Sequence, residues 1–120
     1  MDFSRYENLR ALVRANFSET TQRLVDEALE YADGKLAGVC RYDGAPMLDH
    51  AAAVASIVIS EVGLGRNSAV SSILHDVVRL AHKERPADEF LALTEEIRNR
   101  FGEQVVGITM GLANISELRL

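Results

Sequence analysis

The chain has 120 residues and a formal net charge of −5 at pH 7; 48% of its residues are hydrophobic and 26% are charged. This balance is that of one globular domain and excludes a disordered tail. The negative charge argues against direct DNA binding, which needs lysine and arginine clustered against the phosphates, whereas a nucleotide ligand needs only a few local cations.

Helical periodicity dominates the chain, since apolar residues recur at three- and four-residue spacing. The first segment carries Leu9, Leu12 and Val13, and the second runs from a predicted N-cap at Ser18 to a stop at Gly34. The stretch GKLAGVCRYDGAP, which begins at that glycine, has three glycines, one proline and no sustained period. We expect it to form a loop.

A third helix is predicted from Met47 to Val62 and stops at Gly63, and a fourth begins at an N-cap provided by Asn67 or Ser68. Apolar residues repeat at helical spacing in both segments, so each is expected to bury one face. The positions predicted to face the core are Met47, Leu48, Ala51, Val54, Ala55, Val58, Ile59, Val62, Val70, Ile73, Leu74, Val77 and Val78.

After a charged surface turn at residues 82–89, which contains Pro86, two further helical segments follow with Gly102 between them. The chain therefore predicts an all-α fold of about six helices in a single domain. The helical pattern is still running where the chain stops at ISELRL, so we expect a truncated domain of a longer protein. The core positions predicted here are Phe90, Leu91, Leu93, Ile97, Val105, Val106, Ile108, Leu112 and Ile115.

Cysteine usage and hydropathy bear on the compartment. Cys40 is the only cysteine, so no disulfide can form within the chain and a reducing compartment is favoured. The N-terminus is charged and lacks the apolar centre of a signal peptide, and no apolar run approaches the roughly 20 residues that span a bilayer. We expect a cytoplasmic protein with no membrane contact.

Two histidines and an aspartate interrupt the apolar helices. His50 lies in the first turn of the third predicted helix, and His75 and Asp76 lie midway along the fourth. On neighbouring antiparallel helices these side chains can converge on one divalent cation, and such a mixed set suits Mn²⁺, Fe²⁺ or Zn²⁺ better than Ca²⁺. Spacing alone favours the alternative, in which His75 is a hydrogen-bonded core residue and Asp76 is solvated or paired with an arginine. His82 is assigned to the surface.

Three sequence blocks add to this spacing. YDGAPMLDHAAAVASIV, AVSSILHDVV and EEIRNRFGEQVVGITMGL resemble, in this order, consecutive blocks of the RelA/SpoT alarmone enzymes. The resemblance extends from about Leu24 to the end of the chain. It implies an HD-domain helical bundle, with residues 1–120 as the N-terminal part of the hydrolase domain.

That resemblance also implies a chemistry. His50, His75 and Asp76 would be three of four Mn²⁺ ligands, and the fourth, a later aspartate, is not among these residues. Arg41 would pack on the guanine base, as a guanidinium plane can. The implied reaction removes the 3′-pyrophosphate from guanosine tetra- or pentaphosphate (ppGpp or pppGpp), with a metal-activated water as nucleophile.

The chain departs from the active pattern beside these residues. In active hydrolases of the family an acidic pair follows His-Asp-Val-Val, whereas here Arg79 and Leu80 stand at those positions; likewise Ala113 and Asn114 replace the threonine and lysine of a later motif. On a helix Arg79 shares a face with His75. Two like charges at about 4 Å repel by roughly 4 kcal/mol at an effective dielectric of 20, so Arg79 would oppose a metal. Arg79 also stands three residues after Asp76, so the two can form a pair that satisfies the carboxylate without a metal. The alternative is that Arg79 extends into solvent.

Three functions follow from these observations. The first is a RelA/SpoT-type hydrolase domain that is weak or inactive here, in a parent protein that is a (p)ppGpp synthetase with its synthetase domain downstream. The second is a non-catalytic regulatory domain that keeps a nucleotide pocket around Arg41. The third is an HD phosphohydrolase for another nucleotide. The oligomeric state stays open, with a homo-oligomer as one alternative.

Overall fold

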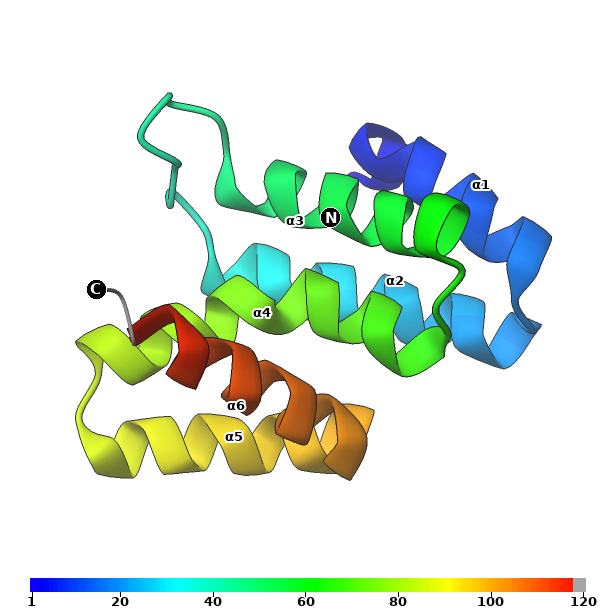
Figure 1. The fold of residues 1–120 in the computed structure, drawn as a ribbon. Coiled ribbons are helices and arrows are strands. Elements are labelled where there is room, and N and C mark those ends of the chain that lie inside the picture. The colour runs from blue at the N-terminus through cyan, green and yellow to red at the C-terminus, as the bar shows by residue number, and fades with distance from the viewer. Residues whose placement is uncertain (118–120) are drawn as a thin grey trace.

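The computed structural model describes residues 1–117, with side chains to residue 114, and these residues form a bundle of six α-helices (Figure 1). The predicted all-α architecture is therefore confirmed. The helices are α1 (Glu7–Asn16), α2 (Glu19–Lys35), α3 (Met47–Ile57), α4 (Arg66–Glu84), α5 (Ala87–Phe101) and α6 (Glu103–Glu117). A 3-10 turn, η1 (Phe3–Tyr6), precedes α1, and a π-helical turn, η2 (Val58–Val62), extends α3.

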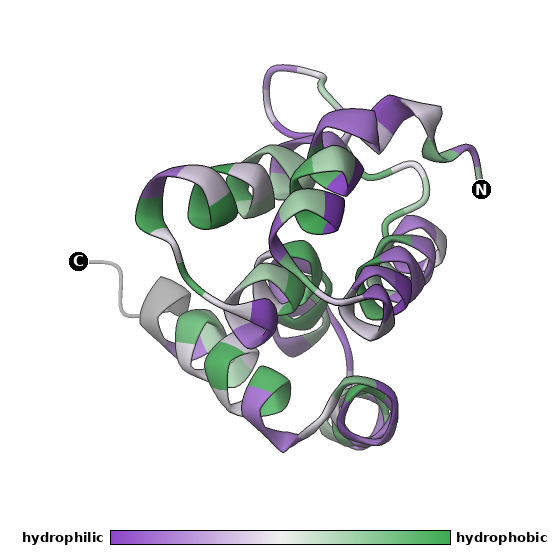
Figure 2. Ribbon diagram, turned by 90° about the vertical axis from the view of Figure 1, so that its right-hand side faces the viewer, coloured by the Kyte–Doolittle hydropathy of each residue, from purple (hydrophilic) through white to green (hydrophobic). Residues whose placement is uncertain are grey.

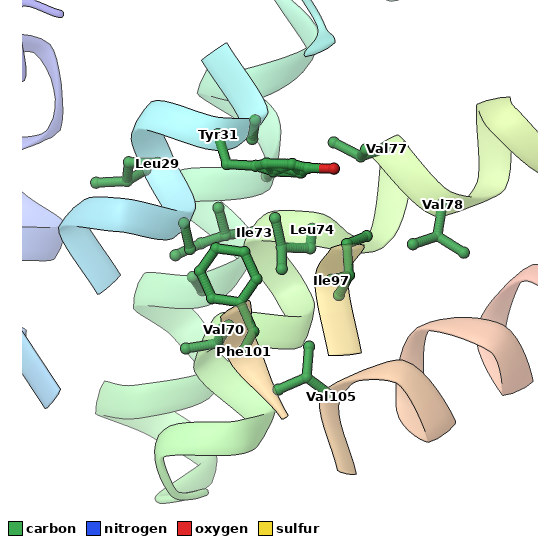
Figure 3. Close-up of a cluster of buried hydrophobic side chains, with 14 of the residues drawn as sticks. Leu29, Tyr31, Val70, Ile73, Leu74, Val77, Val78, Ile97, Phe101 and Val105 are labelled. Carbon is green, nitrogen blue, oxygen red and sulfur yellow. The ribbon is translucent and has the colours of Figure 1, made fainter. Parts of the chain in front are cut away.

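Helix α4 lies at the centre of the bundle and packs against α2, α3, α5 and α6. Figure 1 shows α3 along one side of α4, with α5 and α6 along the other. The sequence explains this position, because α4 carries buried residues around most of its circumference rather than on one face. Figure 3 shows the resulting core, in which Ile73 and Leu74 of α4 lie beside Tyr31 of α2 and Phe101 of α5.

One side of α4 differs from the rest of the helix. Ser68, Ser72, His75 and Arg79 follow one another at intervals of four, three and four residues, and all four are only half-buried. We call this line of residues the polar stripe. Since most other sides of α4 are packed into the core, the polar stripe is where this central helix can meet a ligand.

The surface of the bundle follows the hydropathy pattern. Figure 2 shows hydrophobic residues on the inward sides of the helices and hydrophilic residues on their outward sides. Across the described residues, no helix combines the length and the apolarity that crossing a bilayer requires.

Two predicted helix ends and one boundary are confirmed. The Ser18 hydroxyl accepts a hydrogen bond from the backbone N–H of Thr21 at 3.3 Å and caps α2. Gly63 ends η2 with φ 73°, and Gly102 separates α5 from α6 with φ 104°. Both values lie in the left-handed region, where a side chain would be strained.

Two other predicted ends were wrong. Gly65 is the N-cap of α4, with no side-chain cap, while Asn67 and Ser68 lie inside the helix. The Asn67 amide instead donates to the side chain of Gln104 on α6, so a tertiary contact took the place of the local cap. Gly34 lies within the last turn of α2 rather than beyond it.

The buried face of α6 is also rotated from the prediction. Ile108 and Leu112, expected in the core, are 37% and 39% exposed, while Thr109 is fully buried and Ala113 nearly so. Burial of Thr109 is tolerated because its hydroxyl donates to the backbone carbonyl of Val105 at 2.8 Å. A buried threonine whose hydroxyl is satisfied inside the helix is a pattern that hydropathy alone does not reveal.

Four further expectations concern single residues. Val62 and Leu91 are exposed, because one ends the turn after α3 and the other lies on the outer side of α5. His82 is half-buried rather than on the surface, with its ring edge-on to Phe90 at 4.9 Å between centroids. The predicted core position Ile115 and the running C-terminal pattern fall on side chains or residues outside the described part of the chain.

Candidate functional site

The sequence-predicted site residues come from three neighbouring segments. His75 and Asp76 lie on α4, His50 lies in the first turn of α3, and Arg41 lies in the loop that joins α2 to α3. Helices α3 and α4 run antiparallel and pack together (Figure 1). His50 and Arg79 both lie near enough to His75 for their charges to lower its pKa.

The loop that carries Arg41 is held by its own backbone. The N–H of Met47 donates to the carbonyl of Val39 at 3.0 Å, and the N–H of Arg41 donates to the carbonyl of Ala45 at 2.8 Å. The Asp43 carboxylate accepts from the N–H of Ala45 at 3.0 Å, as aspartate does in tight turns. The predicted loop is therefore a fixed turn.

Asp76 is paired with Arg79. Nε of Arg79 donates to Oδ1 of Asp76 at 3.0 Å, and Nη2 lies 3.0 Å from the same oxygen. The Asp76 side chain is 10% exposed and the Arg79 side chain 27%, so this contact lies largely out of water. Of the two arrangements that the sequence allowed for Arg79, the structure has the pair with Asp76 and not extension into solvent.

His75 has a buried nitrogen with no hydrogen bond. Its Nε2 is buried and has no partner within the described part of the chain, while Nδ1 lies 3.8 Å from Oδ1 of Asp76. Burial lowers the pKa of His75 below its usual value; Asp76 opposes this, and the charges of Arg79 and His50 add to it. The ring is therefore neutral at pH 7, with an unsatisfied nitrogen.

His50 is held by Arg41. Nη1 of Arg41 lies 3.1 Å from Nδ1 of His50. A guanidinium can only donate, so Nδ1 accepts, and the neutral ring carries its proton on Nε2. A metal-bound histidine has the opposite arrangement, in which one ring nitrogen binds the metal and the other donates its N–H.

These residues, as arranged, do not fit a divalent metal ion. Among the described residues, no group of three histidine, cysteine, aspartate or glutamate side chains is close enough to hold one. The Asp76 carboxylate is paired with Arg79, and the Nδ1 of His50 accepts from Arg41, which leaves the proton of the neutral ring on Nε2. The site instead contains two pairs, Arg79 with Asp76 and Arg41 with His50.

The second departure from the family pattern lies elsewhere. Leu80 faces a cavity of about 170 Å³ that Leu36, Val39 and Val77 also line, away from the residues around Asp76. Arg79 does not line this cavity, and its side chain contacts Asp76. Of the two departures, Arg79 is the one that contacts a predicted site residue.

The two replacements in the later motif, Ala113 and Asn114, lie on α6. Ala113 is buried in the core, and Asn114 is exposed. Neither makes a contact with His50, His75 or Asp76 that the structure records.

One set of contacts next to the site was missed from the sequence. Asp49, the neighbour of His50, accepts from the Tyr6 hydroxyl at 2.9 Å and from Arg5 at 2.5 Å. These contacts bring η1 onto α3 at the edge of a cavity of about 390 Å³. Burial and the bond to Asp49 raise the pKa of Tyr6 to about 12. No local pattern marks contacts between residues more than 40 positions apart.

Comparison with known proteins adds to this geometry. The family model for the HD domain matches residues 28–120. A protein of Mycobacterium leprae (strain TN) named "Probable GTP pyrophosphokinase" is 32% identical over 103 residues, which are 86% of this chain and 12% of that protein. The chain thus spans about an eighth of the relative's length. No solved structure matches the chain.

Proposed function

The chain belongs to the HD domain family, in the form found in RelA/SpoT-type enzymes, and from this premise we propose that it is a nucleotide-binding domain derived from a metal-dependent guanosine polyphosphate 3′-pyrophosphohydrolase, with weak or no hydrolytic activity. Its proposed ligand is ppGpp or pppGpp. The observation that carries the proposal is the contact of Arg79 with Asp76 at 3.0 Å.

Loss of hydrolysis follows from the charge at Asp76. HD domains are generally metal-dependent, and Mn²⁺ is the ion that the family resemblance implies for His50, His75 and Asp76. An ion at Asp76 would have to displace or tolerate a guanidinium cation, which opposes it by roughly 4 kcal/mol at about 4 Å for each unit of its charge at an effective dielectric of 20. Without a bound metal the domain has no activated water for attack on phosphorus.

Nucleotide binding is supported by what the site keeps. Arg41 is held against His50 on a fixed turn, so its guanidinium plane is ordered before a ligand arrives. A planar cation suits stacking on a purine base. Binding without turnover is the property expected of a regulatory domain.

The proposal extends to the whole protein. Since the Mycobacterium leprae relative is named as a GTP pyrophosphokinase, we propose that residues 1–120 are the N-terminal part of an HD hydrolase domain in a cytoplasmic (p)ppGpp synthetase of the stringent response. An active HD phosphohydrolase for another nucleotide is the competing function.

One experiment separates these functions. The protein is dialysed to equilibrium against ppGpp in the presence of Mn²⁺, and the nucleotides are then resolved by anion exchange. We expect saturable binding and no pyrophosphate release above a protein-free control. Release of pyrophosphate from ppGpp would show an active hydrolase, hydrolysis of a deoxynucleotide in its place would favour the competing function, and absence of nucleotide binding would refute the proposal.

A further inference from the structure

The site between α3 and α4 has a positive local charge although the whole chain is acidic. Arg41 and Arg79 each bring one positive charge, and Asp76 brings one negative charge. The next carboxylate along α3, Asp49, is held by Arg5 and Tyr6, and Asp43 is bound to the backbone of its own turn. The charge balance at the site therefore favours an anion.

Arg79 keeps donor capacity after it has paired with Asp76. Both of its contacts go to one carboxylate oxygen, Oδ1, and use one edge of the guanidinium. A guanidinium has five N–H donors, so its other edge can donate to a second acceptor, and phosphate oxygens match its geometry. At 27% exposure the Arg79 side chain is within reach of a ligand on the polar stripe.

His75 supplies an independent sign of a ligand. Its Nε2 is buried without a hydrogen-bond partner among the described residues, which costs free energy unless a bound group satisfies it. His75 stands four residues before Arg79 on the polar stripe, so the two side chains share one face of α4. Nδ1 makes no hydrogen bond that would require the proton, so the tautomer with N–H at Nε2 is open to the ring and donates to the same anion as the guanidinium.

We propose that Arg79 takes the place of the metal ion, so that the site binds the phosphate groups of a nucleoside polyphosphate without a divalent cation, through Arg79 and Nε2 of His75. This deepens the proposed function, on which it rests, by naming how the phosphates are held. Asp76, a metal ligand in the family pattern, acts here as the anchor that orients Arg79. The substitution that removed the hydrolase chemistry thus supplied a fixed cation for the same substrate class.

The test is calorimetric titration of the protein in EDTA, with GDP and with inorganic pyrophosphate as probes. We expect GDP to bind with a dissociation constant that EDTA and added Mn²⁺ leave unchanged within about twofold. Arg79→Gln should weaken binding of both probes at least about tenfold, the usual effect of losing a hydrogen bond between charged groups. Arg66→Gln, an exposed arginine on the same helix roughly 20 Å away, is the matched control and should bind as the wild type does.

Asp76→Asn separates the two mechanisms by the direction of its effect. A metal site loses affinity when its carboxylate charge is removed. An anion site held by Arg79 gains affinity, because asparagine keeps an oxygen that accepts from Arg79 while the competing negative charge is gone. We expect binding in EDTA to tighten severalfold. Arg79→Gln tests the same point without touching the carboxylate, and circular dichroism establishes that each variant is folded.

Three outcomes would overturn the inference: GDP binding that EDTA abolishes, wild-type affinity in Arg79→Gln, or loss of binding in folded Asp76→Asn. The first would leave nucleotide binding intact and refute only the replacement of the metal. Absence of binding for both probes and for ppGpp would refute the proposed function as well. If pyrophosphate alone binds, the site recognises the phosphates and not the base.

Discussion

Nη1 of Arg41 lies 3.1 Å from Nδ1 of His50, nine residues further along the chain. This contact joins the turn before α3 to the first turn of the helix, and it determines which ring nitrogen of His50 holds the proton. The guanidinium and the imidazole therefore act as one unit, and a change in either alters the other.

The tautomer of His50 can be measured directly. Long-range ¹H–¹⁵N correlation spectra at pH 8 should show a protonated Nε2 and an unprotonated Nδ1, because Arg41 donates to Nδ1. In Arg41→Ala this preference should be lost. A spectrum with the proton of His50 on Nδ1 in the wild type would contradict the assignment.

Replacing Arg79 by glutamate should create affinity for Mn²⁺. The variant exchanges a cation for a second carboxylate near Asp76, so Mn²⁺ should bind at least about tenfold more tightly than to the wild type. Calorimetric titration measures this, and Mn²⁺ should also raise the melting temperature of the variant. Arg66→Glu, with the same change of charge at a remote position of α4, serves as the control. Tight Mn²⁺ binding by the wild type would contradict the claim that Arg79 opposes a metal ion at Asp76.

The bond between Tyr6 and Asp49 should make stability depend on alkaline pH. The pKa of Tyr6 is about 12 in the folded protein and about 10 when unfolded, so above pH 10 the folded state holds a proton that the unfolded state has lost. The contribution of Tyr6 is complete below pH 10 and is lost as the pH rises towards 12.

Tyr6→Phe isolates this effect. We expect the variant to be about 1 kcal/mol less stable at pH 7, because it lacks a half-exposed hydrogen bond to a carboxylate. Urea unfolding at several pH values should show the gap between wild type and variant narrowing above pH 10. A gap that stays constant to pH 11.5 would contradict the contribution of this hydroxyl.

The position of α4 predicts the cost of truncating its core residues. Leu74 is fully buried at the centre of the core in Figure 3, so Leu74→Ala should lower the free energy of unfolding by about 2–5 kcal/mol. Leu91→Ala makes the same chemical change at a side chain that is 63% exposed, and it should cost less than about 0.5 kcal/mol. Equal losses in the two variants, measured by urea unfolding, would contradict the described core.

The order and type of the helices could be predicted because those signals are local. Apolar spacing, the hydroxyl of Ser18 and the glycines at 63 and 102 act within a few residues of themselves. The phase of α6 could not be predicted, since burying Thr109 instead of Ile108 depends on how α6 packs against α4. The cap of α4 failed for a similar reason, because Asn67 is engaged by Gln104 of another helix.

The candidate site likewise has features that local signals predict and features that depend on contacts between distant segments. That Arg79 and Asp76 share a helix face follows from their spacing of three residues, and the structure has the pair. That Leu80 faces a separate cavity could not be predicted, since the family pattern groups it with Arg79. The proton position of His50 and the partners of Asp49 depend on contacts between distant segments, which a single sequence does not encode locally.

The packing of α4 has a consequence for how such a domain evolves. Because most of this helix is enclosed, most substitutions in it destabilise the fold and are lost for that reason, whatever their effect on function. The polar stripe is not under this constraint, since a half-buried residue such as Arg79 can be exchanged while the bundle still folds. Catalytic activity can therefore be lost during evolution in this architecture, while the helical bundle itself is kept.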